Sequence, residues 1–257
     1  MAASAGSERP AAFTAATCLI AADTHLDEPG GGAAMLQRFL AAAAAQKAVV
    51  LILGDLVNLW YESQRLAARY EPFFAPLREF TARGGRAYFV PGNRDFLAGR
   101  VFARATGLVI LPEITDITVA GTTYRVFHGD QVYLGDRNYR IYRTIVRNGL
   151  VRGLLRILPD FILKGLAGTM QRPPDVPEPG KIIALDLTRF RKRILAPAID
   201  TYLCGHVHRT MQEQPAFDGR RVTVRTVNSW VCAPEYVELG PAGVQVRIVD
   251  CGSRNAE

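Results

Sequence analysis

The chain has 257 residues, of which 49% are hydrophobic, and its formal net charge is +7 at pH 7. A chain of this length can bury the core of one large domain, and its apolar content excludes an intrinsically disordered protein. The pI near 9.5 favours an anionic partner, but charge alone leaves nucleic acid, a phosphorylated substrate and an acidic membrane surface open.

The N-terminal segment is rich in Ala and Ser and lacks the apolar stretch of a secretory signal peptide. No apolar run of the sequence reaches the roughly 20 residues of a membrane-spanning helix. The four cysteines show no CxxC spacing, which indicates core residues in a reducing compartment. We therefore expect a cytoplasmic protein with a disordered N-terminus over residues 1–16 and a single domain over residues 17–251.

Five short apolar runs each end at a polar motif. The runs are 18–22, 49–53, 87–90, 125–127 and 202–204, and they are followed by Asp23-Thr24-His25, Gly54-Asp55, Gly92-Asn93-Arg94, His128-Gly129-Asp130 and Gly205-His206-Val207-His208. Strands of α/β sheets are buried on both faces and read as continuous apolar runs, and ligands bind just beyond their carboxyl ends. The pattern therefore predicts an α/β fold with a functional site at the ends of these strands.

Helical and hairpin patterns lie between and after these runs. The predicted helices are 33–46 and 66–83, the predicted hairpin is 114–127 with its turn at Ala120-Gly121, and the later predicted strands are 221–227, 235–239 and 244–249. This layout favours two sheets packed face to face with helices outside them.

Residues 136–180 differ in composition from the rest of the chain. The part up to Met170 is apolar and rich in Arg, Pro159 is expected to break it into two helices, and four prolines follow in 171–180. We interpret 136–180 as a helical lid insertion with a hinge loop, placed over the active site. The alternative is a helical hairpin packed on the body of the domain with solvated arginines.

All four histidines of the chain fall within the polar motifs. In Asp-x-His and His-x-His after a strand, both side chains lie on the same side of the backbone, so they can bind one ion. Oxygen and imidazole ligands in this order indicate a two-metal centre that hydrolyses phosphate esters. The alternative, histidines satisfied within the core, would have to apply to all four.

The ordered series DxH, GD, GN, HGD and GHVH resembles the calcineurin-like metallophosphoesterase superfamily from residue 18 to about residue 230. The resemblance implies a four-layer α/β/β/α sandwich and two divalent metal ions, commonly Mn. Carried over by motif, it implies one ion held by Asp23, His25 and His208, a second held by Asn93, His128 and His206, and Asp55 bridging both. It also implies in-line attack of a metal-activated water on phosphorus, with Asn93 and His128 as catalytic residues, to which we add Arg94 as a third candidate.

Arg94 departs from the superfamily pattern, because many members carry His at this place in the third motif. Arg cannot act as a general acid at neutral pH, but it binds phosphate through two parallel hydrogen bonds. The residue favours a substrate whose leaving group needs no proton, such as the phosphate released from a pyrophosphate. The alternative is that Arg94 only pairs with Asp95.

The run Gly-Asn-Arg-Asp-Phe-Leu at 92–97 is similar to the UDP-2,3-diacylglucosamine pyrophosphatase family of lipid A synthesis. This resemblance implies hydrolysis of UDP-2,3-diacylglucosamine to UMP and 2,3-diacylglucosamine 1-phosphate. It further implies a lid that holds the acyl chains and peripheral contact with the cytoplasmic face of the inner membrane. The substrate-binding residues that it implies are Asn93, Arg94, Asp136, Tyr139, Arg143, Lys181 and His206.

Two segments depart from that second family, which leaves other substrates open. Residues 58–63 replace its acidic cluster, and the proline-rich 171–180 replaces its Ser/Lys-rich segment. The alternatives are a phosphodiesterase or phosphatase acting on another nucleotide, a nucleic acid or a phosphoprotein, and a degenerate scaffold. We expect no nucleic-acid partner, because the basic residues cluster with apolar ones rather than with aromatic stacking platforms.

Overall fold

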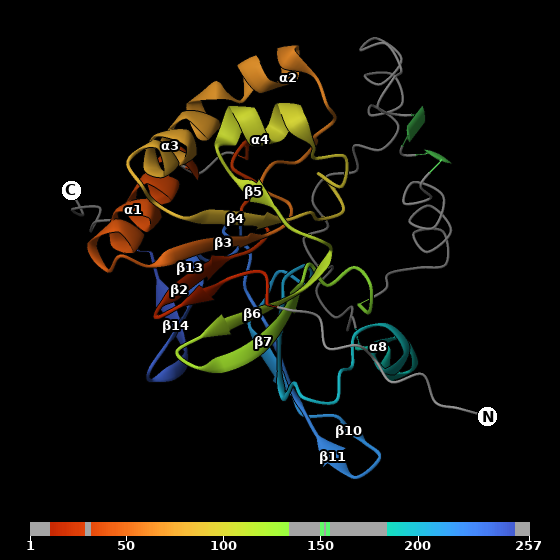
Figure 1. The fold of residues 1–257 in the computed structure, drawn as a ribbon. Coiled ribbons are helices and arrows are strands. Elements are labelled where there is room, and N and C mark those ends of the chain that lie inside the picture. The colour runs from red at the N-terminus through yellow and green to blue at the C-terminus, as the bar shows by residue number, and fades with distance from the viewer. Residues whose placement is uncertain (1–10, 29–31, 134–149, 152, 155–183, 250–257) are drawn as a thin grey trace, which may run out of the picture.

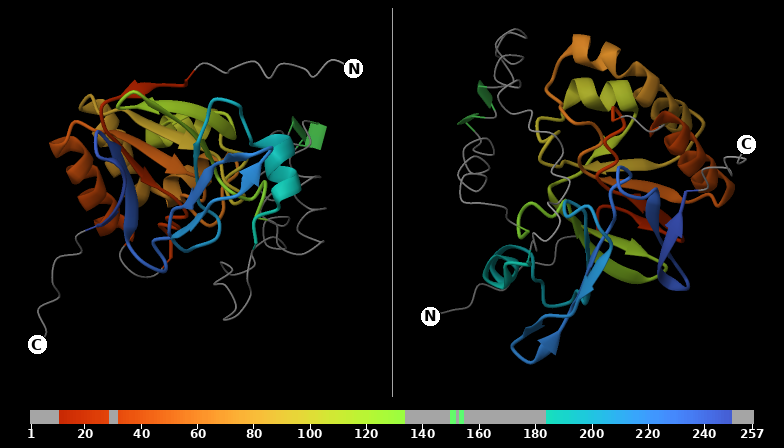
Figure 2. Two further views of the ribbon diagram at one scale, coloured as in Figure 1. Left: turned by 90° about the horizontal axis from the view of Figure 1, so that it is seen from below. Right: turned by 180° about the vertical axis from the view of Figure 1, so that it is seen from behind.

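The computed structural model describes residues 11–28, 32–133, 150–151, 153–154 and 184–249. Two six-stranded sheets face each other, and a small two-stranded hairpin stands apart from them (Figure 1). Helices α1 (Gly32–Ala45) to α4 (Arg100–Thr106) lie over the outer face of one sheet, and α8 (Leu187–Arg193) lies on the opposite side of the molecule, beside the other sheet (Figures 1 and 2). The predicted strand-rich layout of two sheets with helices outside is therefore confirmed.

The first sheet has the order β14-β13-β2-β3-β4-β5. Its strands are β14 (Gly243–Ile248), β13 (Glu235–Gly240), β2 (Cys18–Ala21), β3 (Val49–Leu53), β4 (Ala87–Val90) and β5 (Val109–Ile110). Strands β2 to β5 are parallel, whereas β13 runs antiparallel to both of its neighbours. Every residue of β2 and β3 is buried, which explains why these strands read as uninterrupted apolar runs.

The second sheet has the order β1-β6-β7-β8-β12-β9. Its strands are β1 (Thr14–Ala15), β6 (Ile114–Val119), β7 (Thr122–Phe127), β8 (Thr201–Cys204), β12 (Thr223–Thr226) and β9 (Met211–Glu213), and the separate hairpin is β10 (Ala216–Phe217) with β11 (Arg220–Arg221). The predicted hairpin is confirmed: Ala120 and Gly121 join β6 to β7 with φ angles of 48° and 82°. Positive φ at both central residues is the conformation that a tight hairpin turn favours.

The ordered part of the chain begins earlier than residue 17. Phe13 is buried and stacks on Tyr88 with ring centroids 4.4 Å apart, and β1 pairs in parallel with β6. The expectation of a disordered segment up to residue 16 is therefore wrong for residues 11–16, because an aromatic anchor and backbone pairing hold them in place. Residues 1–10 lie outside the described residues.

The helices are α1 (Gly32–Ala45), α2 (Gln64–Arg69), α3 (Glu71–Ala82), α4 (Arg100–Thr106) and α8 (Leu187–Arg193). The single helix predicted over 66–83 is in fact two helices, α2 and α3, that meet at Tyr70. Pro72 lacks the N–H that would bond to the carbonyl of Ala68 and its ring disfavours that carbonyl's helical position, whereas proline is well tolerated in the first turn of a new helix, where Pro72 lies in α3. No helix in the described part of the chain combines the length and hydrophobicity that a bilayer crossing needs.

Buried side chains form three successive layers of core. Leu19 of β2 belongs to the layer that also holds Phe39 of α1. The next residue, Ile20, faces the opposite way, between the two sheets, where Leu203 of β8 also lies. Phe190 of α8 packs on the far face of the second sheet. The order helices, sheet, sheet, helix confirms the predicted four-layer α/β/β/α sandwich.

Glu62 joins the segment after β3 to the start of α4. Its carboxylate accepts the backbone N–H of Gly99 and of Val101, each at 2.8 Å, and the indole N–H of Trp60 at 3.2 Å. The N-cap residue of α4 is glycine and provides no capping side chain. A carboxylate at this end of the helix satisfies exposed N–H groups and interacts favourably with the helix dipole.

Glu62→Ala is expected to lower the free energy of unfolding by about 2–3 kcal/mol, because it leaves partly buried N–H donors without an acceptor. Urea unfolding followed by tryptophan fluorescence measures this change. Glu79→Ala is the matched control: Glu79 pairs with Arg83 on the solvent-exposed side of α3, and its loss is expected to cost no more than about 0.5 kcal/mol. Equal small losses in both variants would contradict the anchoring role of Glu62.

Candidate metal centre

The polar motifs that follow β2, β3, β4, β7 and β8 come together at one place. Oδ2 of Asp23, after β2, accepts the backbone N–H of His206, after β8, at 2.6 Å. Nδ1 of His128, after β7, lies 2.8 Å from the carbonyl oxygen of Leu53 at the end of β3. These contacts join the carboxyl ends of strands from both sheets into a single site.

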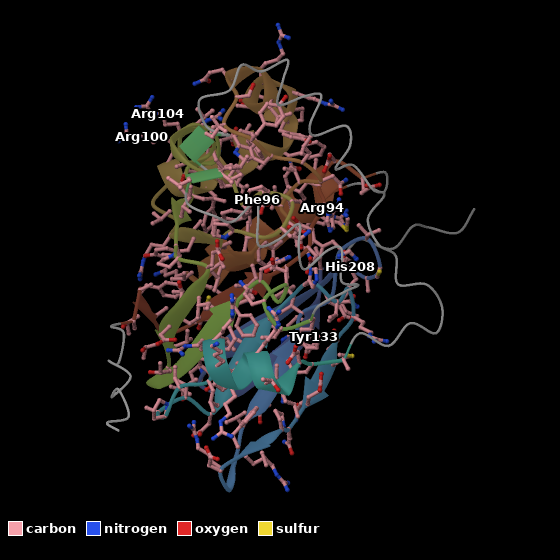
Figure 3. All side chains as sticks on the ribbon, turned by 90° about the vertical axis from the view of Figure 1, so that its right-hand side faces the viewer. Arg94, Phe96, Arg100, Arg104, Tyr133 and His208 are labelled. Atoms are coloured by element: carbon pink, nitrogen blue, oxygen red, sulfur yellow. The ribbon has the colours of Figure 1, made fainter. Side chains whose placement is uncertain are left out.

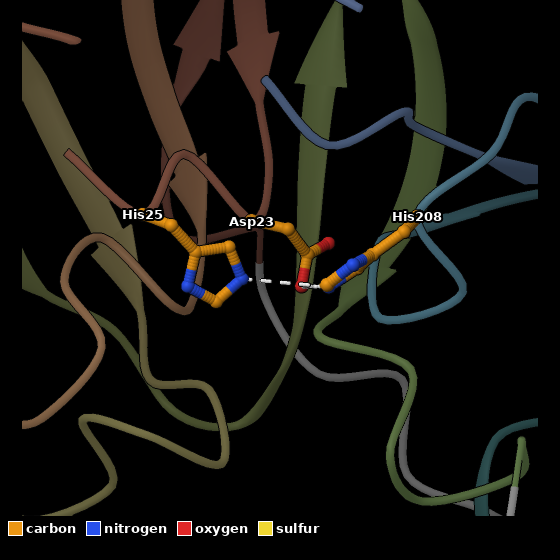
Figure 4. Close-up of side chains that lie close together, drawn as sticks. All are labelled: Asp23, His25 and His208. Atoms are coloured by element: carbon orange, nitrogen blue, oxygen red, sulfur yellow. Dashed lines mark hydrogen bonds and ion pairs between the residues drawn. The ribbon is translucent and has the colours of Figure 1, made fainter. Parts of the chain in front are cut away.

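Asp23, His25 and His208 form the first group of potential metal ligands (Figure 4). Nε2 of His208 lies 3.5 Å from Oδ1 of Asp23 and 3.4 Å from Nε2 of His25. One ligand atom from each residue lies within 4.8 Å of the others, and all three residues are buried. A single cation between them can be reached by all three side chains.

Asp23, Asp55 and His128 form the second group. Nε2 of His128 lies 3.6 Å from Oδ2 of Asp55 and 3.9 Å from Oδ1 of Asp23. Oδ1 of Asp23 thus lies close to the ligands of both groups, so Asp23 also approaches the bridging position that the resemblance implies for Asp55. The ring of His206 lies beside that of His128, with centroids 5.2 Å apart.

The contacts of His128 test whether these residues fit a metal ion. The carbonyl of Leu53 can only accept a hydrogen bond, so Nδ1 of His128 donates to it and Nε2 is the nitrogen that faces the site. Nε2 lies 2.8 Å from Oδ1 of Asn93, so an imidazole nitrogen and a carboxamide oxygen face the same place. Oδ1 of Asp23 is buried and has no hydrogen-bond partner. Carboxylate, imidazole and carboxamide atoms arranged in this way fit a divalent cation.

Electrostatics favour positive charge at the same point. Burial opposes protonation of His128, but the carboxylates of Asp55, Asp23 and Asp130 outweigh it and raise its pKa to about 9. His206 shows the opposite effect: burial and the neighbouring His128 lower its pKa to about 4. Burial acts to raise the pKa of Asp23, yet the surrounding histidines hold that pKa below its usual range. The carboxylates of the centre therefore attract a cation, and the lowered pKa of His206 keeps its imidazole unprotonated for binding.

The backbone at this site is unusual. Among the described non-glycine residues, eight have positive φ, and five of these eight are predicted metal ligands. They are Asp23, His25, Asp55, His206 and His208, with φ between 40° and 73°. Such conformations cost of order 1 kcal/mol or more each and persist only where the surrounding structure imposes them. The ligand geometry is therefore set by the fold, not by local preference.

Two glycines of the motifs let the backbone approach the carboxylates closely. A Cβ atom at Gly92 would collide with Oδ1 of Asp55, and one at Gly205 would collide with Oδ2 of Asp23. Glycine is used where a side chain would block such an approach. In the Gly-Asn and Gly-His motifs, the glycine thus lets the backbone pack against an aspartate of the site, and the next residue is a predicted metal ligand.

Arg94 and Asn93 are partly exposed at the edge of the site. The backbone N–H of Arg94 donates to Oδ1 of Asp55 at 2.8 Å. Arg94 and His208 lie on the same face of the molecule (Figure 3). The other predicted substrate contacts are Asp136, Tyr139, Arg143 and Lys181, and they lie outside the described residues, as does most of 136–180.

Ser229 supports the site, although the sequence does not reveal this role. Its hydroxyl donates to the backbone carbonyl of Asp23 at 2.8 Å, and its neighbour Trp230 donates its backbone N–H to the same oxygen at 3.3 Å. A serine 206 residues away from Asp23 leaves no periodic signal, so only the folded chain shows the contact.

A family model described as calcineurin-like phosphoesterase matches residues 16–210. The chain belongs to this family. The match covers all five motifs and confirms the superfamily that the sequence resembles. The chain is therefore a metal-dependent phosphoesterase, and the buried Asp and His groups described above are candidate ligand groups for the divalent metals that the family uses.

Similar proteins carry a more specific name. The UDP-2,3-diacylglucosamine hydrolase of Salmonella agona (strain SL483) is 31% identical over 241 residues, which cover 89% of this chain and 97% of that protein. The enzyme of the same name from Edwardsiella ictaluri (strain 93-146) is 29% identical over 234 residues, covering 89% of this chain and 90% of that protein. A solved phosphoesterase from E. coli aligns at 16% identity with a TM-score of 0.46 and covers 93% of this chain and 97% of its own.

Proposed function

We propose that this phosphoesterase hydrolyses the pyrophosphate bond of UDP-2,3-diacylglucosamine to UMP and 2,3-diacylglucosamine 1-phosphate. The observation that carries the proposal is Arg94, held at the edge of the metal-ligand groups by its contact with Asp55. The position offers a phosphate-binding group and no general acid, which suits a pyrophosphate whose leaving phosphate needs no proton. The names of relatives that match 89% of the chain support the same substrate.

The proposed centre holds two divalent ions, with Mn as the metal. One ion would be held by Asp23, His25 and His208 and the other by Asn93, His128 and His206, and Asp55 would be shared between the two. When bound, such ions lower the pKa of a water molecule and polarise the phosphoryl oxygens. Support comes from the two overlapping ligand groups and from the buried Oδ1 of Asp23, which belongs to both groups and has no hydrogen-bond partner.

The side chains around the centre would orient the substrate. Arg94 can bind two oxygens of one phosphate at once, which fixes the pyrophosphate for in-line attack on phosphorus. Asn93 and His206 would contact the same phosphate from the metal side.

The insertion at 136–180 is the proposed lid for the acyl chains. Asp136, Tyr139, Arg143 and Lys181 would contact the substrate there, and the basic and apolar composition suits peripheral contact with the cytoplasmic face of the inner membrane. Within the described part of the insertion, Leu150 is 86% exposed and Leu154 is 54% exposed. These side chains lie one helical turn apart, which supports an apolar surface on this segment.

The test is an assay of the purified protein with Mn on UDP-2,3-diacylglucosamine, with UMP as the measured product. UDP-N-acetylglucosamine and bis-p-nitrophenyl phosphate are run alongside. We expect rapid UMP release from the diacylated substrate and little from the sugar nucleotide without acyl chains. Diester cleavage without UMP release would refute the proposed substrate while leaving the metal centre in place.

A further inference from the structure

Asp95 is fully buried, and its two carboxylate oxygens bind two different loops. Oδ2 accepts the backbone N–H of Leu56 at 2.8 Å, and Oδ1 accepts the backbone N–H of Gly92 at 2.7 Å. Leu56 directly follows Asp55, and Gly92 directly precedes Asn93. One side chain therefore holds the backbone beside two predicted metal ligands.

Asp55 makes the reciprocal contact. Its Oδ1 accepts the backbone N–H of Arg94 from the loop that carries Asp95, while its Oδ2 lies 3.6 Å from Nε2 of His128. The two loops are thus joined by reciprocal hydrogen bonds. The carboxylate of Asp95, in the loop after β4, accepts a backbone N–H of the loop after β3, and the carboxylate of Asp55, in the loop after β3, accepts a backbone N–H of the loop after β4. With Oδ1 of Asp55 held in this way, the direction of Oδ2 toward the metal-ligand group is determined.

These reciprocal hydrogen bonds leave little conformational freedom for either loop. Gly92 packs directly on Asp55, where even a Cβ atom would collide. The backbone N–H of Trp60 also donates to the carbonyl of Arg94 at 3.0 Å, further along the same two loops. Any shift of the loop after β4 would therefore move Arg94 relative to Asp55.

Only a carboxylate fits the position of Asp95. An asparagine has one oxygen, so its NH₂ group would face one of the two backbone N–H donors and leave that donor without an acceptor.

We propose that Asp95 is a positioning residue of the metal centre. It holds the loops after β3 and β4 so that Asp55 and Asn93 face the same ion. The inference rests on the two-metal centre proposed above and is independent of the substrate's identity.

The test compares Asp95→Asn with wild type by calorimetric titration of the metal-free protein with Mn. We expect Mn to bind about 10–100-fold more weakly, the usual effect of removing a group that orients metal ligands. Turnover should recover toward the wild-type value when Mn is raised to saturation, because Asp95 acts through the metal ligands and not on the substrate.

Asp116→Asn is the matched control, since Asp116 is also a buried carboxylate but pairs with Arg125 at 2.7 Å on the second sheet. It is expected to lose thermal stability and to keep wild-type Mn affinity. Asp95→Glu keeps the charge but displaces the carboxylate oxygens, so we expect it to bind Mn with intermediate affinity. This variant replaces Asp95→Asn in the test if Asp95→Asn does not fold.

Two results would overturn the inference: wild-type Mn affinity in a folded Asp95 variant, or equal weakening of Mn binding in Asp116→Asn. A wild-type protein that binds no Mn would instead refute the proposed centre itself. A wild-type protein that binds Mn but releases no UMP would refute only the substrate.

Discussion

Asp23→Asn is expected to reduce kcat/KM by at least about 10³-fold, equivalent to about 4 kcal/mol of transition-state stabilisation. The carboxylate lies in both potential ligand groups, with Oδ1 3.5 Å from Nε2 of His208 and 3.9 Å from Nε2 of His128. Asparagine keeps the volume of the side chain and an oxygen that can accept the N–H of His206, so the variant removes chiefly the charge. Metal content at fixed free Mn should fall at both sites.

Metal analysis after dialysis and steady-state kinetics measure this prediction. Asp218→Asn is the control, because Asp218 is an exposed residue in the turn between β10 and β11 and pairs with Arg191. It should retain wild-type metal content and rate. An Asp23→Asn protein with full metal occupancy and full activity would refute the assignment of the centre.

Arg94→Ala is expected to lower kcat by about 10²–10³-fold while metal content stays at the wild-type level. The guanidinium group is proposed to bind the phosphate that is attacked, so its removal affects the reaction directly. The backbone N–H of Arg94 is what contacts Asp55, and alanine retains that N–H. The ligand geometry should therefore survive the loss of the side chain.

Kinetics at saturating Mn, together with metal analysis, separate these two effects. Arg94→Lys keeps the charge but loses the bidentate geometry, so an intermediate rate is expected. Arg193→Ala in the last turn of α8 is the control for loss of one exposed positive charge and should leave the rate unchanged. Loss of metal in Arg94→Ala would show that the side chain supports the centre and would exclude the proposed role in phosphate binding.

The strands and the motifs at their ends were predictable from the sequence. β2 and β3 are buried on both faces, so their composition is uniformly apolar and the polar residue after each strand is conspicuous. The hairpin of β6 and β7 was likewise visible, because residue alternation and the Ala120-Gly121 turn are local features. The order of such features along the chain was enough to predict the layered fold and the family.

The sequence by itself therefore determined the fold class, the family and the identity of the candidate ligands, since each depends on residue type and short spacing. Only the tertiary structure decided that Asp23 approaches both ligand groups, that Asp95 holds the loops beside Asp55 and Asn93, and that Glu62 anchors α4. Most of these contacts join residues far apart in the sequence, by 37 positions for Glu62 with Gly99, 39 for Asp95 with Leu56 and 183 for Asp23 with His206. Local periodicity carries no information about such pairs, because they are created when the two sheets pack and bring distant strand ends together.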